Sequence, residues 1–491
     1  MVSPDEINSS LNAHHEWLLV RDFGRTFPLD RSEIVIEGEH GKTFFGFLDD
    51  AGFHSKRVTD AAVLDGEIRL DLASAFGKER ETVRLVSRVA ASELAVEVEI
   101  ARLKTANEIA KLIETSFVGY TLGRVTLNAD NGRIAQIEFE SETRQPLAAI
   151  ADVTGKISPE TLITSAMLWL EKLGARKRKP TLEIWIIGER ARMRNVQKLH
   201  AIMSERWKAK ITVLYIDRKI EPPQLVPLPA RRIAELWREK PRKLALPPAL
   251  NLSDTARAII ATSPETIDAV VSKQGETLRF HGLLIARVRP MGAGRDSAWF
   301  GVSKRRQILS QETADDLIEM IRELESHRTC NASNKRHDLY RAAPEAWLES
   351  ILRRNIKLLD SNLILSPIYN QFRSANDKID LLALRRDGRL VVIELKTQPN
   401  REAVFQAADY WRKIELLRRR GMLAAANLFE GREIKDESAL VYLVAPAWSF
   451  HRDFEFFAAS LAPEIELWRW ELHEKWREKI EVLARINYSA R

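Results

Sequence analysis

Cysteine is nearly absent from this sequence of 491 residues, in which Cys330 stands alone. A single cysteine cannot form an intramolecular disulfide, and it excludes both a zinc cluster built on cysteine pairs and the disulfide framework of a secreted domain. Long apolar runs are also missing, because nowhere do about 18 uncharged apolar residues follow one another. The N-terminus, MVSPDEINSS, lacks the basic and apolar regions of a signal peptide. We therefore expect a cytoplasmic protein without a membrane partner.

Charge is distributed unevenly along the chain. Residues 1–115 hold 14 Lys or Arg against 21 Asp or Glu, a net of −7, so the total of +7 leaves +14 for the remainder. Residues 171–243 hold 20 basic and 8 acidic side chains, a net of +12. A local basic field indicates a polyanion such as nucleic acid, although a solvated basic helix is the alternative. The candidate nucleic-acid contacts are the basic run Arg176, Lys177, Arg178 and Lys179.

Alternation of apolar and polar residues predicts β-strands in the first hundred residues. The segment SELAVEVEIARL places Leu94, Val96, Val98 and Ile100 on one face of such a strand. The runs SEIVIEGEH, KTFFGFLDD and GEIRLDL, separated by Gly and Asp turns, predict further strands. Residues 1–115 are therefore expected to form an acidic β-rich domain.

From residue 116 onward, predicted helices alternate with predicted strands. A strand pair in GRVTLNADNGRIAQIEFES precedes a helix at 160–174, the strand TLEIWIIG, the basic helix RARMRNVQKLHAIMSERWKAK and the strand ITVLYID. Seven prolines within 220–250 predict a linker, which contains one short amphipathic segment, RRIAELWREK. Residues 251–335 predict a small α/β segment.

The last part of the chain, 336–491, predicts another α/β unit. Its expected elements are a helix at 344–358, a strand pair, a helix at 402–420, the strand ALVYLVA, a helix at 453–461 and the strand IELWRWEL. Continuous apolar strands between amphipathic helices are typical of a sheet that is covered on both faces.

Within this unit, the segment KIDLLALRRDGRLVVIELKT carries a pattern with chemical meaning. Its second strand is apolar enough to be central in a sheet, yet it contains Glu394 and Lys396. Side chains two apart on a strand share a face, and buried charges are costly unless they are paired or hold a metal. Asp380 lies on the preceding strand, near enough across a hairpin to reach the same point. Two carboxylates and an amine can bind Mg²⁺ and organise a water against a phosphodiester.

Neighbouring helices add further candidates. Gln406 and Tyr410 lie at positions i and i+4 of the predicted helix 402–420, so they share a face. Glu345 and Glu349 share a face of the helix that begins at PEAWLES, and either could add a carboxylate. A surface ion pair is the alternative for Glu394 and Lys396, and packing on the sheet is the alternative for Gln406 and Tyr410.

The strand Asp, the E-x-K strand and the Q-x-x-x-Y helix together resemble the RecB-like branch of the PD-(D/E)xK nuclease superfamily. More narrowly, PEAWLES through QAADYW is similar to the C-terminal domain of NucS-type endonucleases, although Ile379 stands where the motif has Pro. The resemblance implies that Asp380, Glu394 and the Leu395 carbonyl bind Mg²⁺ or Mn²⁺ and that Lys396 positions the attacking water. It further implies that Gln406 and Tyr410 brace the site, and that Glu349, with Glu345 as its rival, is the first-helix acid.

A shorter match suggests an internal duplication. Laying 123–141 over 379–397 without a gap pairs NGRIAQIEFES with DGRLVVIELKT, and helix, strand, helix and strand follow in both halves. A chance match of two hairpins is the alternative. In this alignment Asp380 faces Arg124 and Lys396 faces Glu140. Residues 116–219 are therefore interpreted as a degenerate nuclease-like module.

These patterns predict a multidomain α/β protein with a restriction-endonuclease-like core and a mixed sheet at 336–491. The expected function is metal-dependent hydrolysis of DNA phosphodiester bonds, in DNA repair or in defence against foreign DNA. The alternative is a non-catalytic nucleic-acid-binding or scaffold protein that retains a nuclease fold. The sequence leaves RNA as a substrate, the oligomeric state, a homodimer included, and the choice between exo and endo action open.

Overall fold

The structure is a computed structural model. It describes residues 3–21, 25–39, 42–49, 52–64, 66–73, 80–87, 91–128, 132–142, 144–176, 179–241, 252–272, 275–290, 296–302, 307–365, 380–429 and 431–488. The chain divides into two compact units. Unit 1 comprises Met1–Ser158, Ala166–Met193 and Val213–Leu228, and unit 2 comprises Pro159–Ser165, Arg194–Thr212 and Pro229–Arg491. The described residues contain four sheets flanked by helices, so the expected mixed α/β, multidomain fold is confirmed.

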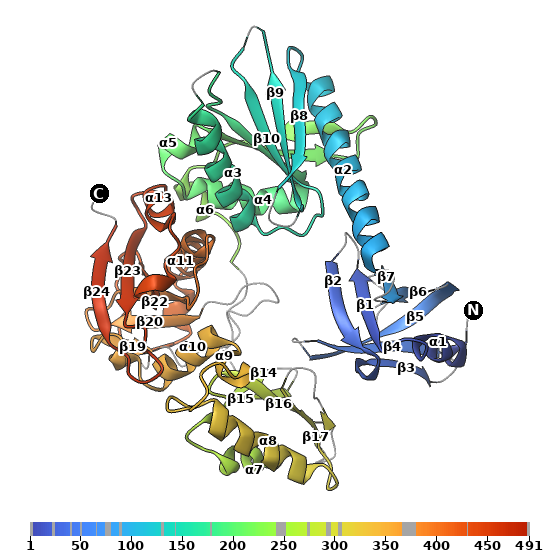
Figure 1. Cartoon of the computed structure of the whole chain (residues 1–491). Helices are drawn as coiled ribbons and strands as arrows, with labels where there is room; N and C mark the ends of the chain where they lie inside the picture. The colour runs from blue at the N-terminus through green and yellow to red at the C-terminus, as the bar shows by residue number, and fades with distance from the viewer. Residues whose placement is uncertain are drawn as a thin grey trace. The chain divides into compact units, whose positions relative to one another are not determined.

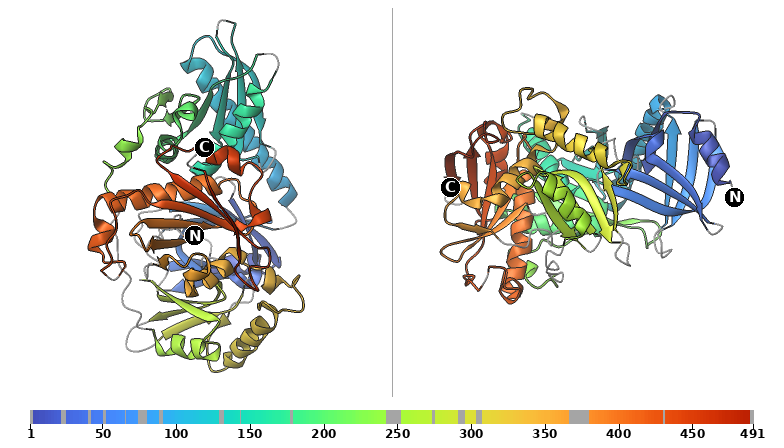
Figure 2. Two further views of the ribbon diagram at one scale, coloured as in Figure 1. Left: turned by 90° about the vertical axis from the view of Figure 1, so that its left-hand side faces the viewer. Right: turned by 90° about the horizontal axis from the view of Figure 1, so that it is seen from below.

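Unit 1 begins with a seven-stranded antiparallel sheet in the order β2-β1-β7-β6-β5-β4-β3, coloured blue in Figures 1 and 2. Its strands are β1 (Glu16–Arg21), β2 (Arg25–Asp30), β3 (Ile34–Glu39), β4 (Lys42–Asp49), β5 (Gly52–Leu64), β6 (Glu67–Ala73) and β7 (Arg80–Ser87). Helix α1 (Pro4–Leu11) packs on β3, and the turn η2 (Arg31–Glu33) directly precedes β3. The buried side chains include Trp17, Phe45 and Phe47. The β-rich N-terminal domain is therefore confirmed.

The segment SELAVEVEIARL is not a strand, because it lies in the long helix α2 (Ala91–Ser116). The alternation extends over only four apolar residues, and Ala, Glu, Leu, Lys and Arg are strong helix formers. Leu94 and Val98, four apart, pack with Val20 and Val86 as helix positions do, whereas Val96 and Ile100 are 58% and 61% exposed. No helix among the described residues is long and apolar enough to cross a membrane.

The second sheet of unit 1 has six strands in the order β13-β12-β11-β10-β9-β8. They are β8 (Thr121–Leu127), β9 (Ile134–Glu140), β10 (Leu147–Asp152), β11 (Ile184–Glu189), β12 (Ile211–Asp217) and β13 (Gln224–Pro227), with helices α3 (Pro159–Gly174), α4 (Arg190–Ala201) and α5 (Glu205–Lys208) between them. Strand β10 has no counterpart in the sequence prediction. The expected basic helix is two helices, α4 and α5.

The proline-rich segment 220–250 is more than a linker. Strand β13 belongs to the second sheet, and the short helix α6 (Ile233–Leu236) forms in the predicted amphipathic segment. Within unit 2, Trp237 packs edge to face on Trp411 with ring centroids 5.8 Å apart, and Arg420 donates a hydrogen bond to the Trp237 carbonyl. The linker prediction is therefore wrong for 224–237, and residues 242–250 lie outside the described residues.

A five-stranded antiparallel sheet forms the small α/β segment in unit 2. Its strands are β14 (Ile267–Ser272), β15 (Gly275–Phe280), β16 (Leu283–Pro290), β17 (Asp296–Phe300) and β18 (Gln307–Ile308), and α7 (Asp254–Thr262) and α8 (Ala314–His327) pack into its core. The β15–β16 turn carries Gly282 at φ +78°, where a Cβ atom would lie 2.0 Å from the Ala346 carbonyl oxygen. Only glycine lets this turn approach that backbone so closely.

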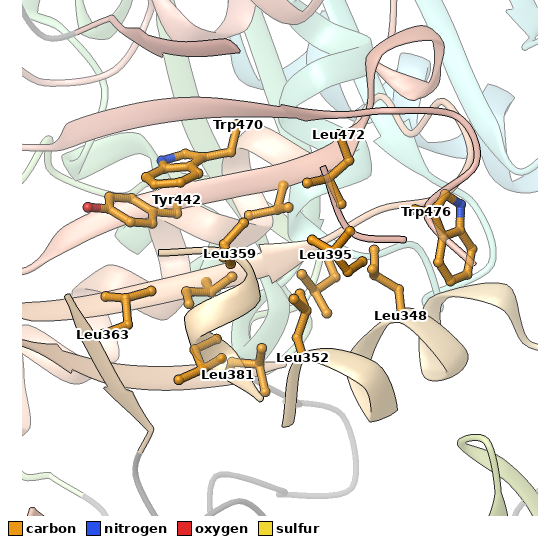
Figure 3. Packing of buried hydrophobic residues seen from close by; sticks show 14 of the residues in the cluster. Leu348, Leu352, Leu359, Leu363, Leu381, Leu395, Tyr442, Trp470, Leu472 and Trp476 are labelled. Atoms are coloured by element: carbon orange, nitrogen blue, oxygen red, sulfur yellow. The ribbon is translucent and has the colours of Figure 1, made fainter. Parts of the chain in front are cut away.

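The C-terminal sheet of unit 2 is coloured orange to red in Figures 1 and 2 and has the order β19-β20-β21-β22-β23-β24. Its strands are β19 (Leu363–Leu365), β20 (Leu381–Arg385), β21 (Leu390–Leu395), β22 (Leu440–Pro446), β23 (Glu466–Leu472) and β24 (Val482–Asn487). The helical elements are α9 (Asp338–Arg341), α10 (Pro344–Arg354), η4 (Ile356–Leu358), α11 (Ala403–Arg419), α12 (Met422–Ala425), η5 (Ala447–Ser449) and α13 (Phe454–Ala458). Figure 3 shows Leu395 and Leu472 of the sheet packed in one cluster with Leu348 and Leu352 of α10.

The two six-stranded sheets have the same topology. In each, a helix precedes three strands that pair antiparallel, the third strand pairs parallel with the fourth after a helical crossover, and the last pair is antiparallel. Strand β8 therefore corresponds to β19, and β10 corresponds to β21. The ungapped overlay of 123–141 on 379–397 is wrong by one strand, because it places β9 on β21 and omits β10.

Candidate active site

The β20–β21 hairpin brings Asp380 and Glu394 to the same end of the C-terminal sheet. Leu381 pairs with Ile393 in an antiparallel register, so Asp380, one residue before β20, lies opposite Glu394. The Leu395 N–H donates a hydrogen bond to Asp380 Oδ2 at 2.9 Å. This bond fixes the Asp380 carboxylate beside the strand that carries Glu394 and Lys396, as the sequence predicts.

Glu394 and Lys396 lie next to each other and are almost completely buried. The Lys396 Nζ atom donates to Glu394 Oε1 at 2.7 Å, and the two residues are 7% and 2% exposed. Leu395, between them, points to the opposite face and belongs to the hydrophobic cluster. A parallel pairing with β22, in which the Lys396 N–H donates to the Val444 carbonyl, continues the ladder through these charged residues.

Burial and neighbouring charges perturb both groups. Burial raises the pKa of Glu394 above its ordinary range, and the nearby Asp380 carboxyl raises it further, while Lys396 offsets only part of the effect. Burial alone would lower the pKa of Lys396, but the carboxylates of Glu394 and Glu345 outweigh it and raise that pKa. The pair is coupled, because a neutral Glu394 would remove the attraction that stabilises the Lys396 charge. Lys396 therefore keeps its proton, and Glu394 carries the cost of burial.

The donor set fits a divalent cation. Glu394 Oε2 is buried and has no hydrogen-bond partner in the described part of the chain. An unpartnered buried carboxylate oxygen is unfavourable, and a cation at that point would offset the cost. The Leu395 carbonyl points towards the side of the strand where Asp380 lies, since the N–H and C=O of one strand residue face the same neighbour. No three His, Cys, Asp or Glu side chains form a ligand cluster within the described ranges, so this set would rely on two carboxylates and a carbonyl.

Helix α10 adds a third carboxylate to the site. Glu345, in its first turn, has an exposed side chain whose Oε2 lies 4.0 Å from Lys396 Nζ. Glu349, one turn later, is 2% exposed. Burial raises the pKa of Asp268 on β14, and the charge of Glu349 adds a smaller effect in the same direction. Of the two predicted rivals, Glu345 is therefore the one whose carboxylate lies within ion-pair distance of Lys396.

The buried guanidinium of Arg328 sets the start of α10. Arg328 is 0% exposed and donates hydrogen bonds to five carbonyl oxygens: those of Phe280 and His281 at the β15–β16 turn, and those of Leu339, Ala342 and Ala343 around the start of α10. It also lies 4.6 Å from the centre of the Trp347 ring. Burial, with a smaller effect of Arg477, lowers the pKa of Arg328 to about 9. These bonds position the turn of α10 that carries Glu345.

Helix α11 packs on β21 and β22 and carries Gln406 and Tyr410, both half-buried. Gln406 Oε1 and the hydroxyl of Thr397 are buried without a hydrogen-bond partner among the described residues. With Glu394 Oε2, three unpartnered polar oxygens come from the end of β21, the loop after it and the first turn of α11. Tyr410 lies under the Lys413 ammonium, 5.4 Å from the ring centre. The roles of Gln406 and Tyr410 in bracing the site stay predictions.

The two described residues of the basic run in unit 1, Arg176 and Lys179, differ in whether their charge is already paired. Arg176 makes two hydrogen bonds to Glu138, at 2.5 and 3.2 Å, and Lys179 is exposed. Lys177 and Arg178 lie outside the described residues. Three tryptophans of the basic region 171–243 and its flank, Trp169, Trp185 and Trp207, are each less than 10% exposed, so these side chains pack in the core.

Sequence reasoning missed one residue near the site. Trp448, in η5 directly after β22, is 85% exposed. The available signal was the position of AWSF immediately after the apolar strand ALVYLVA, because ligands of α/β sheets bind beyond the carboxyl ends of parallel strands.

Comparisons with known proteins find a partial and distant similarity. No family model matches the chain. A stretch of 142 residues, 29% of this chain, is 30% identical to Endonuclease NucS of Arthrobacter sp. (strain FB24), and the match spans 59% of that endonuclease. A solved structure described as EndoMS in apo form aligns with 37% of this chain and 81% of its own at 12% identity, with a TM-score of 0.15. The chain is thus distantly similar, over part of its length, to the NucS endonuclease.

Proposed function

We propose that the C-terminal domain hydrolyses phosphodiester bonds of DNA with Mg²⁺ or Mn²⁺ bound at Asp380, Glu394 and the Leu395 carbonyl. The observation that supports this most is the buried Glu394 carboxylate, which has one oxygen on the Lys396 ammonium and the other without a hydrogen-bond partner among the described residues. A purely structural ion pair would be expected to satisfy both oxygens. The partial similarity to a protein named as an endonuclease supports the same reaction.

The residues of the chain would have separate roles in this reaction. Asp380 and Glu394 would hold the cation, which when bound would lower the pKa of a water and neutralise charge on the phosphate. Lys396, charged and next to Glu394, would orient the water or stabilise charge that develops on the phosphate. Glu345, exposed and 4.0 Å from Lys396 Nζ, would hold that ammonium from the solvent side. Gln406 and Tyr410 would brace the site from α11.

The nuclease-like module at 116–219, which contains the basic run, would contact the phosphate backbone of the nucleic acid. Contacts of this kind position a nucleic acid without reading its sequence, and they weaken as salt is added. Lys179 is an exposed candidate, whereas the charge of Arg176 is already paired with Glu138. DNA repair or defence against foreign DNA are the settings in which such an enzyme would act.

The test is cleavage of labelled single-stranded, duplex, flapped and mismatched DNA, with an RNA strand included, in Mg²⁺ or Mn²⁺ and in EDTA. Wild-type protein should cut at least one substrate, and Glu394→Gln and Lys396→Ala should not. Both variants should keep the wild-type circular dichroism spectrum. Cleavage that persists in Glu394→Gln, or that is unaffected by EDTA, would contradict the proposal.

A further inference from the structure

Trp448 has a fixed backbone and an exposed ring. Its side chain is 85% exposed, whereas Trp17, Trp347 and Trp411 are completely buried. The Trp448 N–H donates to Glu474 Oε1 at 2.9 Å, and the adjacent Ser449 hydroxyl donates to the Thr397 carbonyl at 3.0 Å. Both neighbouring loops therefore hold the turn that presents this ring. The exposure is thus a feature of an ordered turn, and the indole face is available to stack on a flat ligand.

The turn lies at the same edge of the sheet as the candidate active site. Strands β21 and β22 run parallel with Leu395 opposite Val444, so both end at this edge, and Trp448 comes four residues after Val444. The Ser449 bond to Thr397 joins the turn directly to the residue that follows Lys396. One hydrogen bond thus links the turn that carries Trp448 to the loop that directly follows Lys396.

The surroundings of the ring fit a polyanion. Arg452, four residues after Trp448, has a side chain that is 90% exposed with its Nε 3.8 Å from Asp453 Oδ2, and Lys475, next to Glu474, is also exposed. Exposed cations together with an exposed aromatic ring are the combination that grips the backbone of a nucleic acid strand and stacks on its bases. A purely apolar protein partner would have to bury these charges.

We propose that Trp448 stacks on an unpaired base of the nucleic acid next to the phosphate bound at the active site, which rests on the proposed nuclease function. An indole ring can stack only on a base whose face is free, and in an intact duplex both faces are covered by neighbouring base pairs. The site therefore selects strands with an unpaired nucleotide beside the cleaved bond: single strands, flaps or mismatches. Stacking does not depend on which base is present.

The experiment measures binding and cleavage separately. Trp448→Ala and Trp448→Phe are made in the Lys396→Ala background, and Ile308→Ala, which removes a 64% exposed apolar side chain from β18, is the matched control. Fluorescence anisotropy with labelled single-stranded and blunt duplex oligonucleotides in Mg²⁺ gives the affinities. Trp448→Ala should weaken single-strand binding roughly 10- to 100-fold, as loss of one base–aromatic stack does. Trp448→Phe should retain most of the affinity, duplex binding should change little, and Ile308→Ala should change neither.

A second readout reports the stack directly. A 2-aminopurine base in the single strand should be quenched on binding to the Lys396→Ala protein and less so with Trp448→Ala. Equal affinities of the Trp448 variants for single strands, or an equal loss on duplex, would overturn the proposal. Loss of self-association in Trp448→Ala with unchanged nucleic-acid binding would assign the ring to a second copy of the chain and would overturn it too.

Failure of this proposal differs from failure of the proposed function. If wild-type protein cleaves DNA and Trp448→Ala binds and cleaves as well, stacking is wrong and the nuclease function stands. If single strands bind through Trp448 but wild-type protein cleaves nothing in Mg²⁺ or Mn²⁺, stacking stands and hydrolysis is wrong. Because the ring is exposed, both Trp448 variants should unfold at the wild-type urea midpoint.

Discussion

Each six-stranded sheet carries an acid at or next to the last residue of its corresponding central strand, β10 or β21, but the two acids have different surroundings. At the end of β10, Asp152 accepts hydrogen bonds from the Thr154 N–H, the Thr154 hydroxyl and the Ile157 N–H, each at 2.9 Å, and Arg192 Nε lies 3.8 Å away. At the end of β21, Glu394 has Lys396 on one oxygen and no hydrogen-bond partner among the described residues on the other.

The difference separates a saturated acid from an unsaturated one. The loop after β10 turns back on Asp152 and saturates it, so that carboxylate stabilises its own loop and has little capacity left for a ligand. The loop after β21 leaves Glu394 unsaturated in a buried position, which costs stability and keeps an oxygen available. Two sheets of the same topology, in which Asp152 is saturated and Glu394 is not, are what a duplicated fold with one degenerate copy would be expected to show.

The largest expected effect is on catalysis. Lys396→Ala and Glu394→Gln should each lower the rate of DNA cleavage by at least roughly 10² to 10³-fold, because each removes a group that would act in the transition state. Asp152→Asn, the matched change in the other sheet, should leave the cleavage rate within about twofold. A gel-based cleavage assay under single-turnover conditions measures all three. Equal loss in Asp152→Asn would remove the distinction between the two acids.

Cation binding should distinguish the two acids next. At a Mn²⁺ concentration of 100 times Kd, the wild-type protein should gain about 2.7 kcal/mol of stability, since the cation binds only the folded state. Differential scanning fluorimetry and titration calorimetry would report this gain. Glu394→Gln should lose it and Asp152→Asn should keep it. A Mn²⁺ response that survives in Glu394→Gln would place the cation elsewhere.

The free energy of unfolding should depend more on Asp152 than on Glu394, the reverse of the order expected for cleavage. Asp152→Ala leaves the N–H groups of Thr154 and Ile157 without their acceptor, and this should lower the free energy of unfolding by about 1–3 kcal/mol. Glu394→Gln removes a buried charge that is incompletely satisfied, and without metal it should cost less than Asp152→Ala. Urea denaturation followed by circular dichroism gives both values. A larger loss in Glu394→Gln than in Asp152→Ala would contradict this ranking.

The pH dependence of stability sharpens the comparison further. Because the pKa of Glu394 is raised in the folded protein, this carboxyl favours folding while it is protonated and loses that contribution as pH rises from its ordinary value of 4.5 through the raised value. Each unit of pKa difference corresponds to about 1.4 kcal/mol. Without metal, the wild-type free energy of unfolding should therefore fall relative to that of Glu394→Gln as pH increases. Parallel curves for the two proteins would show that the Glu394 pKa is not raised.

The smallest effect should come from the basic run. Lys179→Glu should weaken DNA binding and reduce the slope of log K against log salt by about 1, because one phosphate contact is lost. Arg176→Glu should change the slope less, since Glu138 already pairs with that guanidinium. Binding titrations between 50 and 200 mM salt, roughly the range over which such contacts are usually resolved, decide this. A salt slope that is unchanged in Lys179→Glu would remove this residue from the interface.

Much of the C-terminal domain could be predicted because its signals are local. The apolar strands β21, β22 and β23, the helix α11 and the shared face of Glu394 and Lys396 follow from residue type and spacing. The strand predicted within α2 is wrong, because a short alternation of apolar residues hides the helix-forming residues around it. The first-helix acid could not be chosen from sequence, because Glu345 and Glu349 share a helix face. The start of the helix that carries them is positioned by Arg328, which also donates to the His281 carbonyl far away along the chain.

Arg328 also bears on where this protein can be cut. Its guanidinium joins the β15–β16 turn to the start of α10, so the small sheet and the C-terminal sheet share one polar anchor within unit 2. A recombinant fragment that begins at residue 336 would leave the backbone carbonyls of Leu339, Ala342 and Ala343 without their donor. We expect a recombinant fragment that begins at residue 336 to melt at a lower temperature than one that begins at residue 252 and keeps Arg328.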